Sequence, residues 1–286
     1  MRKNKNVVLV KVISLTMETN DWPMETPEYW SQVSQIAEME PPSENFKFDW
    51  IARKVPLYAR RPTAFDVVYL QDVATHFDGL GLLTSNKIAK ALKEPMRGHT
   101  PETYADAVFS PTRRLRDVSV WTIKSFHHWL TLKHMSGRNV NKFDHIVEIG
   151  AGIGESARMA FDAFGYKGKY TIVDLPNIIP FSQKNLEGYN VNFTTDYTSV
   201  VPTKNTLLFS TWGLSEIELT LREQMMDHID PAFMFIAFQG MIFGIDNREY
   251  FIKKYPTKYE KSIAVKHIPL HHVDGGNFYL WAKPIL

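Results

Sequence analysis

Residues 147–156 read VEIGAGIGES and carry three glycines at alternate positions, between a short apolar run and a helical pattern. Glycine has no side chain and adopts positive φ readily, so Gly150 and Gly152 allow a tight turn and let a ligand lie against the backbone. Gly154 allows the following helix to begin close to the strand. The turn after the first strand of a parallel sheet is a usual place for nucleotides, so this stretch predicts a nucleotide-like ligand.

Strand and helix patterns alternate from residue 143 onward. Helices that connect short apolar strands imply right-handed crossovers and a parallel sheet. Two further strand patterns near the end of the chain flank the turn residues HHVDGG, which predicts an antiparallel hairpin at a sheet edge. The predicted strands are 145–150, 169–175, 191–194, 206–211, 232–239, 261–270 and 277–284, and the predicted helices are 155–165, 176–189 and 215–229.

Residues 1–140 differ in texture and carry helical patterns without a recognisable motif. The longest pattern covers residues 110–135 and ends where Gly137, Asn139 and Asn141 follow. We therefore predict two regions: a helical N-terminal region, 1–140, that caps the site and contacts the acceptor, and a ligand-binding α/β domain, 141–286.

Composition excludes several classes of function. The formal net charge of +2 gives no argument for nucleic acid or an anionic membrane as a partner. The chain has no cysteine, which removes disulfides and thiolate chemistry and fits a cytoplasmic location. The basic start with an apolar run resembles a signal peptide, but Lys11 interrupts it and no small-residue cleavage site follows. No segment reaches the ~20 apolar residues of a membrane span.

The identity of the nucleotide depends on charge. The dinucleotide fingerprint G-x-G-x-x-G requires glycine at position 155, where this chain has Glu155. A carboxylate at the helix N-terminus would oppose a pyrophosphate, which disfavours NAD and FAD. Glu148, on the strand, suits an ammonium group or the amides of the turn. Asp174, at the end of the second strand, suits ribose hydroxyls, and Asp196, after the third strand, suits an adenine amino group.

Together these stretches resemble the class I S-adenosylmethionine-dependent methyltransferases, with VEIGAGIGES similar to that superfamily's first motif and IVDLP to its second. VEIGAGIGESARMA, YTIVDLPNII, LLFSTWGLSEIE and the tail HIPLHHVDGGNFYLWAKP resemble, more narrowly, the bacterial sugar O-methyltransferase family. The resemblance implies a Rossmann-like α/β fold of seven strands, mostly parallel with an antiparallel C-terminal strand, and methyl transfer from S-adenosylmethionine to a sugar hydroxyl.

The resemblance also implies roles for individual residues along the cofactor. Glu148 and the three glycines of the turn would line its methionine part, Asp174 would hold the ribose, and Leu175 would lie beside the adenine. The remaining residues border the adenine or close the site below the sulfonium, where an indole face attracts a cation: Asp196, Tyr197, Ser210, Thr211 and Trp212.

Transfer to a sugar hydroxyl needs a general base or a metal, because the hydroxyl barely ionises at neutral pH. His271 and His272 are the first candidates, although HHVDGG also reads as a solvated turn. Glu216, after the WGLS turn, is the second candidate. His127 and His128 in the long helix are interpreted as packing or surface residues. No cluster has metal-ligand spacing, so we predict no metal.

Other residues near these candidates have local explanations. Ser215 and Glu218 match a capping box that would start a helix, and Asp246 and Asn247 are interpreted as a helix cap rather than as part of the acceptor pocket. Three alternatives to the sugar methyltransferase stay open: a methyltransferase for another small molecule or for nitrogen, an inactive cofactor-binding subunit, and an NAD-dependent oxidoreductase.

Overall fold

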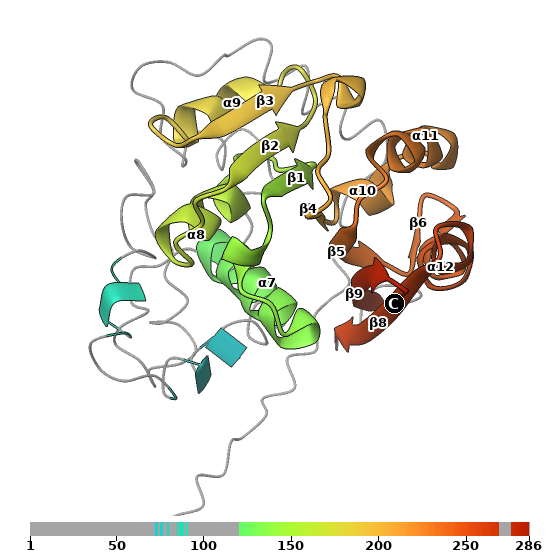
Figure 1. Cartoon of the computed structure of the whole chain (residues 1–286), viewed down its shortest axis with the longest axis horizontal. Coiled ribbons are helices and arrows are strands. Elements are labelled where there is room, and N and C mark those ends of the chain that lie inside the picture. The colour runs from blue at the N-terminus through green and yellow to red at the C-terminus, as the bar shows by residue number, and fades with distance from the viewer. Residues whose placement is uncertain are drawn as a thin grey trace, which may run out of the picture.

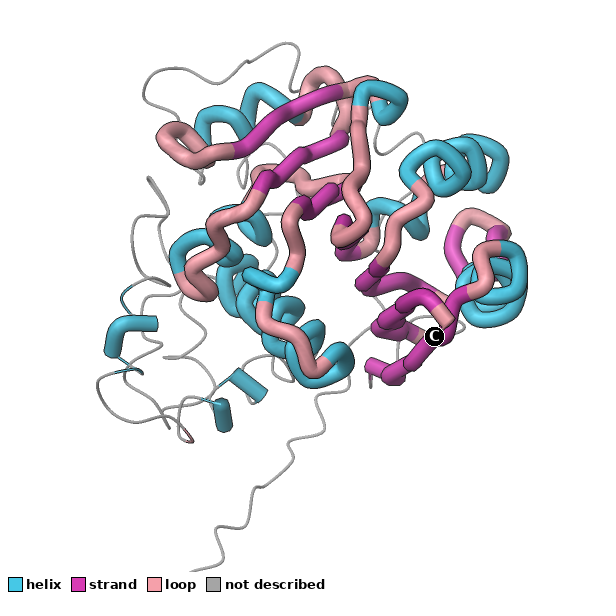
Figure 2. The backbone as a smooth tube through the Cα atoms, viewed as in Figure 1, coloured by secondary structure: helices cyan, strands magenta, loops and turns pink. Residues whose placement is uncertain are grey.

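The computed structural model describes residues 120–268 and 276–285, together with scattered residues between 72 and 90. A seven-stranded sheet in the order β3-β2-β1-β4-β5-β9-β8 forms its centre (Figures 1 and 2). The strands have the following bounds: β1 His145–Ile149, β2 Lys169–Val173, β3 Val191–Thr194, β4 Thr206–Thr211, β5 Phe233–Gln239, β8 Lys261–Ile268 and β9 Asn277–Pro284. All seven predicted strands are therefore present.

The pairing of the strands agrees with the predicted topology. Strands β1 to β5 are parallel to one another, and β9 is antiparallel to both β5 and β8. The order of the strands in the sheet changes direction at β1, because β2 and β3 lie on one side of β1 whereas β4 and β5 lie on the other. This strand order places the turns after β1, β2 and β4 at the carboxyl ends of the parallel strands. This end of the sheet is the topological switch point where ligands bind in open α/β sheets. The α/β fold class is confirmed.

One face of the sheet is covered by α7 (Val120–Ser136) and α8 (Glu155–Asp162). Trp129 of α7 stacks on Phe209 of β4 with ring centroids 4.2 Å apart, and Phe209 stacks in turn on Phe235 of β5. Helix α7 therefore lies on the N-terminal side of the predicted boundary at residue 140 but packs in the core of the sheet. The division of function at that boundary stays a prediction.

The opposite face is covered by α11 (Leu219–Ile229), the π-helix η4 (Glu249–Lys254) and α12 (Tyr255–Lys258). Met225 and Met226 of α11 and Phe251 of η4 pack with the apolar side chains of β1, β4 and β5 that point away from α7. The sheet thus has a hydrophobic core on each face, as a parallel sheet buried on both sides requires. No helix in the described ranges is long and apolar enough to cross a membrane.

All three helices predicted after residue 141 differ from those observed. The helix predicted for 155–165 is α8, which ends at Asp162. The helix predicted for 176–189 is the shorter α9 (Ile179–Asn185), and Pro180 rather than Pro176 lies in its first turn. The helix predicted for 215–229 is divided into α10 (Gly213–Glu216) and α11, because Ile217 has an extended backbone with ψ of 138°. Sequence analysis also did not predict the hairpin of β6 (Met241–Ile242) and β7 (Ile245–Asp246) or the π-helix after it.

Candidate functional site

The carboxyl ends of the parallel strands bring the candidate residues together. Gly150 follows β1, Asp174 follows β2, and Trp212 follows β4. The register aligns the last residues of β1 and β2, Ile149 with Val173. These three turns therefore lie at one edge of the sheet, and the residues predicted from separate motifs share one site.

The turn after β1 has the backbone shape that sequence analysis predicts. Gly150, Gly152 and Gly154 have φ of 72°, 58° and 79°, a region that side chains other than glycine rarely adopt. The Gly150 amide donates to the Val173 carbonyl at 3.0 Å, and the Gly152 amide donates to Asp174 Oδ2 at 2.8 Å. The turn is therefore fixed against the end of β2 by these two hydrogen bonds.

Gly213, in the segment after β4, packs against this turn. A Cβ atom on Gly150 would lie 2.9 Å from the Cα atom of Gly213, and a Cβ atom on Gly213 would lie 2.9 Å from both Gly150 Cα and the Ile149 carbonyl oxygen. The turns after β1 and β4 thus touch through two glycines. Sequence analysis did not single out Gly213. Its only signal is its position, one residue beyond Trp212.

Gly154 has a different neighbour from the expected one. A Cβ atom there would lie 2.6 Å from Leu186 Cδ1 and 3.4 Å from Ser182 Cβ, so the close approach is to the α9 segment and not to the strand. Gly154 is also the N-cap of α8. Its role in the position of α8 is therefore packing between two helices.

Asp174 is partly buried at the centre of the site. Its Oδ1 atom accepts a hydrogen bond from the Leu175 amide at 2.7 Å, and its Oδ2 atom accepts the bond from Gly152. Burial raises the pKa of Asp174 to about 6, although these backbone bonds oppose the shift. A carboxylate has about four lone-pair positions, so it retains acceptor capacity beyond the two amides. Leu175 beside it is 46% exposed, an apolar surface next to the carboxylate.

Glu148 lies beneath the turn, on the face of the sheet that α8 covers. It is 1% exposed, and Tyr170 donates its hydroxyl hydrogen to Glu148 Oε2 at 2.8 Å. Burial raises the pKa of Glu148 to about 8, and the nearby negative charge of Asp174 adds to the shift. Glu148 is therefore a protonated side chain below pH 8, bound to Tyr170.

Glu155 does not face the site. Its carboxylate accepts a bond from Thr122 of α7 at 2.7 Å and pairs with Arg158 at 2.6 Å, and both charged side chains are buried. The expected repulsion between Glu155 and a pyrophosphate is therefore wrong in its physical basis, because the Arg158 guanidinium compensates the charge. The absence of glycine at position 155 still separates this turn from the dinucleotide fingerprint.

Asp196 and Tyr197 follow β3 at the same edge. Asp196 is exposed and caps the 3₁₀ helix η3 (Tyr197–Ser199) by accepting bonds from the Thr198 amide at 2.9 Å and its hydroxyl at 2.6 Å. These bonds hold the pKa of Asp196 below its usual range. The Tyr197 ring packs edge-on against His228. Contact of either residue with an adenine stays a prediction.

Ser210 and Trp212 close the site on the β4 side. Ser210 is fully buried, donates its hydroxyl hydrogen to the Ile149 carbonyl at 2.8 Å and accepts a bond from the Leu214 amide at 2.8 Å. It therefore ties β4 to the end of β1. Trp212 has φ of 77° and ψ of −45°, a left-handed conformation that costs a bulky residue about 1–3 kcal/mol.

Of the three candidate bases, only Glu216 lies among the described residues. It is the last residue of α10, the short helix that follows Trp212, and it is partly exposed. His271 and His272 lie outside the described residues. Their neighbour His267 is exposed near the end of β8, with its ring packed on Phe278.

The predicted capping box at Ser215 and Glu218 is wrong. Glu218 is itself the N-cap of α11, and its carboxylate accepts bonds from the Thr220 and Leu221 amides at 3.0 and 3.1 Å. The Ser215 hydroxyl instead lies 2.6 Å from the Trp212 carbonyl oxygen. Asp246, in contrast, caps the segment that follows β7, because it accepts bonds from the amides of residues 248 and 249.

A buried polar chain lies between α7 and β9, near the same end of the sheet. The Tyr279 hydroxyl is 3.1 Å from His127 Nδ1 and 2.8 Å from His128 Nδ1, and His127 Nε2 is 3.0 Å from Asp72 Oδ2. Burial lowers the pKa of both histidines, most strongly for His128. These histidines are buried and hydrogen-bonded, not on the surface. Only the long-range contact with Tyr279 reveals this, so sequence spacing carries no signal for it.

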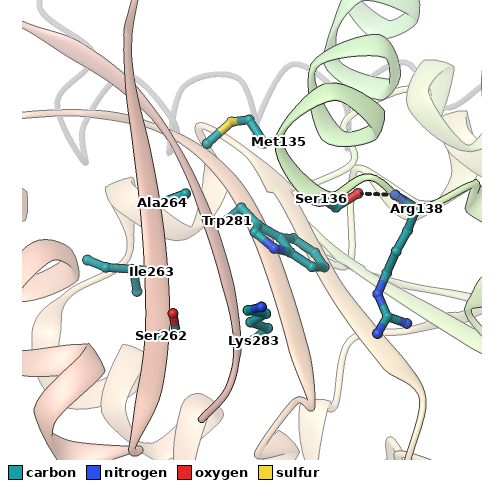
Figure 3. A pocket seen from close by; sticks show the side chains of 8 residues that line it. All are labelled: Met135, Ser136, Arg138, Ser262, Ile263, Ala264, Trp281 and Lys283. Atoms are coloured by element: carbon teal, nitrogen blue, oxygen red, sulfur yellow. Dashed lines mark hydrogen bonds between the residues drawn. The ribbon is translucent and has the colours of Figure 1, made fainter. Parts of the chain in front are cut away.

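A cavity of about 350 Å³ lies away from these turns, between the end of α7 and the β8–β9 edge (Figure 3). Ser262 and Lys283 in its lining are paired near the start of β8 and the end of β9, at the opposite end of the sheet from Gln239 and Asn277. The cavity is therefore separate from the candidate site. Among the described residues, no group of three His, Asp or Glu side chains could hold a metal ion.

Comparisons with known proteins add the following. The chain matches no protein-family model, and it matches no curated protein sequence. Among solved structures, it is similar to the methyltransferase domain of bacterial CtHen1, with 9% identity, a TM-score of 0.44, and coverage of 57% of this chain and 99% of that one.

Two further similar structures are also methyltransferases. The phosphoethanolamine N-methyltransferase 2 of Haemonchus contortus, in complex with S-adenosylhomocysteine, has 14% identity and a TM-score of 0.40, with coverage of 55% of this chain and 52% of that one. A SAM-dependent methyltransferase of Leishmania major has 11% identity and a TM-score of 0.41, with coverage of 57% and 82%. These similarities concern the fold and assign no acceptor to this chain.

Proposed function

We infer that the protein is an S-adenosylmethionine-dependent methyltransferase that methylates an oxygen, and that the acceptor is a sugar hydroxyl of a glycan or a nucleotide sugar. The observation that supports this most directly is the hydrogen bond between the Gly152 amide and Asp174 Oδ2 at 2.8 Å. It joins a glycine turn that a ligand can approach closely to a carboxylate that can hold two vicinal hydroxyls.

The residues at this edge fit the cofactor part by part. Asp174 retains lone pairs for ribose hydroxyls, and the exposed side chain of Leu175 offers an apolar surface for an adenine. Gly150 packs against Gly213 and Gly154 against Leu186, so Gly152 is the glycine of the turn against which the methionine part is proposed to lie. The cofactor supplies an activated methyl group. The protein contributes alignment of the acceptor with that group, an entropic effect that is worth several kcal/mol in well-oriented reactions.

Glu155 does not decide between a ligand with phosphates and one without, because its carboxylate is paired with Arg158 in the same helix. The preference against NAD rests on the spacing of the glycines. The fingerprint G-x-G-x-x-G requires glycine at position 155, where this chain has glutamate. An NAD-dependent oxidoreductase is therefore the weaker alternative on this spacing and not on charge.

The acceptor side is argued from Glu216. It lies on the loop after β4, four residues beyond Trp212, and it is partly exposed. A carboxylate there can accept the proton of a hydroxyl during transfer, as a general base. His271 and His272 are the other proposed bases. The sugar is supported by the sequence resemblance, and Glu216 provides a carboxylate of the kind that transfer to a hydroxyl would need.

The acceptor is tested by incubation of the full chain with S-adenosylmethionine and a panel of compounds. The panel contains free sugars, nucleotide sugars, phosphoethanolamine and RNA, and mass spectrometry detects both S-adenosylhomocysteine and the methylated product. Methylation of a sugar, lost in Glu216→Gln or in His271→Ala/His272→Ala, supports the proposal. Methylation of phosphoethanolamine or RNA alone would replace the sugar with another acceptor. Binding of the cofactor with no product from any panel member favours the inactive subunit.

A further inference from the structure

Arg222 of α11 is a buried cation whose guanidinium binds neutral groups. Its side chain is 0% exposed, Nη1 donates to Asn247 Oδ1 at 2.8 Å, and Nη2 donates to the carbonyl oxygens of Ser215 and Ile217, each at 2.8 Å. No salt bridge of the described residues includes it. The rings of Tyr250 and Phe251 lie 5.0 Å from its Cζ atom. Carbonyl dipoles and ring faces therefore compensate a charge that a carboxylate usually neutralises.

Asn247 extends this network to two more segments. Its Nδ2 atom donates to the Ser215 carbonyl at 3.2 Å and to the Gln239 carbonyl at 3.0 Å, and the residue is fully buried. We call Arg222 and Asn247 with these carbonyl partners the polar clamp. It joins α11, the link between α10 and α11, the end of β5 and the residue after β7.

The polar clamp acts on Trp212 through Ser215. The Trp212 carbonyl accepts a bond from the Ser215 amide at 2.9 Å, and the Ser215 hydroxyl lies 2.6 Å from the same oxygen and 2.8 Å from Gln239 Oε1. The hydroxyl has one hydrogen, so it serves one of these two oxygens at a time. Trp212 itself donates its amide to the Ala237 carbonyl at 2.8 Å. Its positive-φ conformation is thus fixed from both sides of the residue.

The same loop contributes both sides of the candidate site. Gly213 follows Trp212 and abuts Gly150 of the glycine turn. Glu216 lies between Ser215 and Ile217, whose two carbonyl oxygens bind the one Nη2 atom of Arg222. A guanidinium is a rigid planar fork, so it fixes these oxygens in one relative position. A lysine ammonium is a mobile point charge and cannot replace that geometry.

We propose that Arg222 and Asn247 are positioning residues, which hold the 212–217 loop so that Trp212 and Gly213 border the cofactor and Glu216 faces the acceptor. This positioning role rests on the proposed function. The clamp itself is defined by the hydrogen bonds of Arg222 and Asn247. The clamp also accounts for the break between α10 and α11, because the carbonyls of Ser215 and Ile217 bind Arg222 instead of continuing a helix.

The test compares Arg222→Met and Arg222→Lys with Met226→Ala in the full chain. Met226 lies one turn further along the same helix, is 0% exposed and belongs to the apolar core, so its replacement is expected to destabilise the fold while the hydrogen bonds of the clamp remain. Hydrogen exchange, followed by mass spectrometry, reports on peptides that cover 210–218 and 239–248. We expect exchange in both peptides to rise about tenfold or more in the two Arg222 variants, and to change by less in Met226→Ala.

Isothermal titration with S-adenosylhomocysteine gives the second readout. We expect the affinity to fall by about tenfold or more in Arg222→Met, with little recovery in Arg222→Lys, and by about twofold or less in Met226→Ala. Equal exchange in Arg222→Met and Met226→Ala would overturn the clamp, and equal affinity would overturn its positioning role. Faster loop exchange in a protein whose wild type binds no S-adenosylhomocysteine would support the clamp and contradict the proposed function. Where Arg222→Met does not fold, Asn247→Ala is expected to give both the exchange and the affinity changes.

Discussion

The amide of Gly152 donates a hydrogen bond to the carboxylate of Asp174, 22 positions later in the chain, and the two atoms are 2.8 Å apart. This bond connects the turn after β1 with the end of β2. Asp174 therefore fixes the turn, and under the proposed function it also accepts hydrogen bonds from the ribose hydroxyls of the cofactor. The first prediction follows from this double role.

Replacement of Asp174 by alanine is expected to weaken binding of S-adenosylhomocysteine by about 10- to 100-fold, because hydrogen bonds to a charged group contribute about 1.5–3 kcal/mol. Isothermal titration measures the change. Asp227→Ala is the matched control, an exposed carboxylate of α11 whose bonds are to Lys258 and Tyr259. A loss in the control that equals the loss in Asp174→Ala would contradict the assigned role of Asp174.

Alanine at Gly150 is expected to destabilise the fold by more than alanine at Gly137. Both glycines have positive φ, but only at Gly150 would a Cβ atom meet another backbone, at 2.9 Å from Gly213. The difference between the two variants isolates the collision, for which overpacking costs about 1–3 kcal/mol. Urea unfolding measures both variants. Equal free energies of unfolding would mean that the two turns separate without cost.

Glu148 is expected to make stability depend on pH. Its pKa is raised to about 8 in the folded protein, above the ordinary value of 4.5, so the native state retains a proton that the unfolded chain loses. This contribution is complete below pH 4.5 and disappears as the pH rises to about 8, with a slope of at most about 1.4 kcal/mol per pH unit.

The matched variant is Glu148→Gln, which keeps an oxygen for the Tyr170 hydroxyl but does not titrate. Urea unfolding at several values between pH 5 and pH 8 should show that the wild type loses stability relative to this variant as the pH rises. Two parallel stability curves would show that Glu148 does not hold a proton in the folded protein.

The buried pair of Glu155 and Arg158 is expected to respond asymmetrically to mutation. Arg158→Met leaves the Glu155 carboxylate buried without its partner, which costs about 3–5 kcal/mol. Glu155→Met/Arg158→Met removes both charges of the pair and should recover much of that loss, because Asp162, the second carboxylate on Arg158, is partly exposed and retains its hydrogen bond from Tyr189. Chemical denaturation measures both variants. A double variant no more stable than the single one would show that the pair contributes more than mutual compensation of charge.

Glu216 and Glu218 form a pair of acids two positions apart with different expected roles. Once an acceptor is known, Glu216→Gln should reduce turnover by about 100-fold or more, the usual contribution of a general base. Glu218→Gln affects the cap of α11 and should leave turnover nearly unchanged. Rate measurements over a range of pH distinguish them, since loss of the base also removes the acidic limb of the profile. Equal rates would assign the base elsewhere, with His271 and His272 next.

Local patterns in the sequence predict the strands and the glycine turn, because apolar runs and glycine conformations are properties of short segments. The contacts that complete the site are long-range. The approach of Gly150 to Gly213 depends on how β1 and β4 pair. The break after α10 depends on Arg222 and on its partner Asn247, which lies 25 positions beyond Arg222 in the chain. The pattern of Ser215 and Glu218 predicts one continuous helix, because the hydrogen bonds from Arg222 to the Ser215 and Ile217 carbonyls cannot be inferred from it.

The measurement that tests the central claim most directly is isothermal titration of the full chain with S-adenosylhomocysteine and S-adenosylmethionine, with NAD as the control ligand. The geometry of the glycine turn and Asp174 predicts saturable binding of both sulfur nucleotides at one site per chain, and no binding of NAD. Folded protein that binds neither sulfur nucleotide, or that binds NAD in their place, would contradict the account.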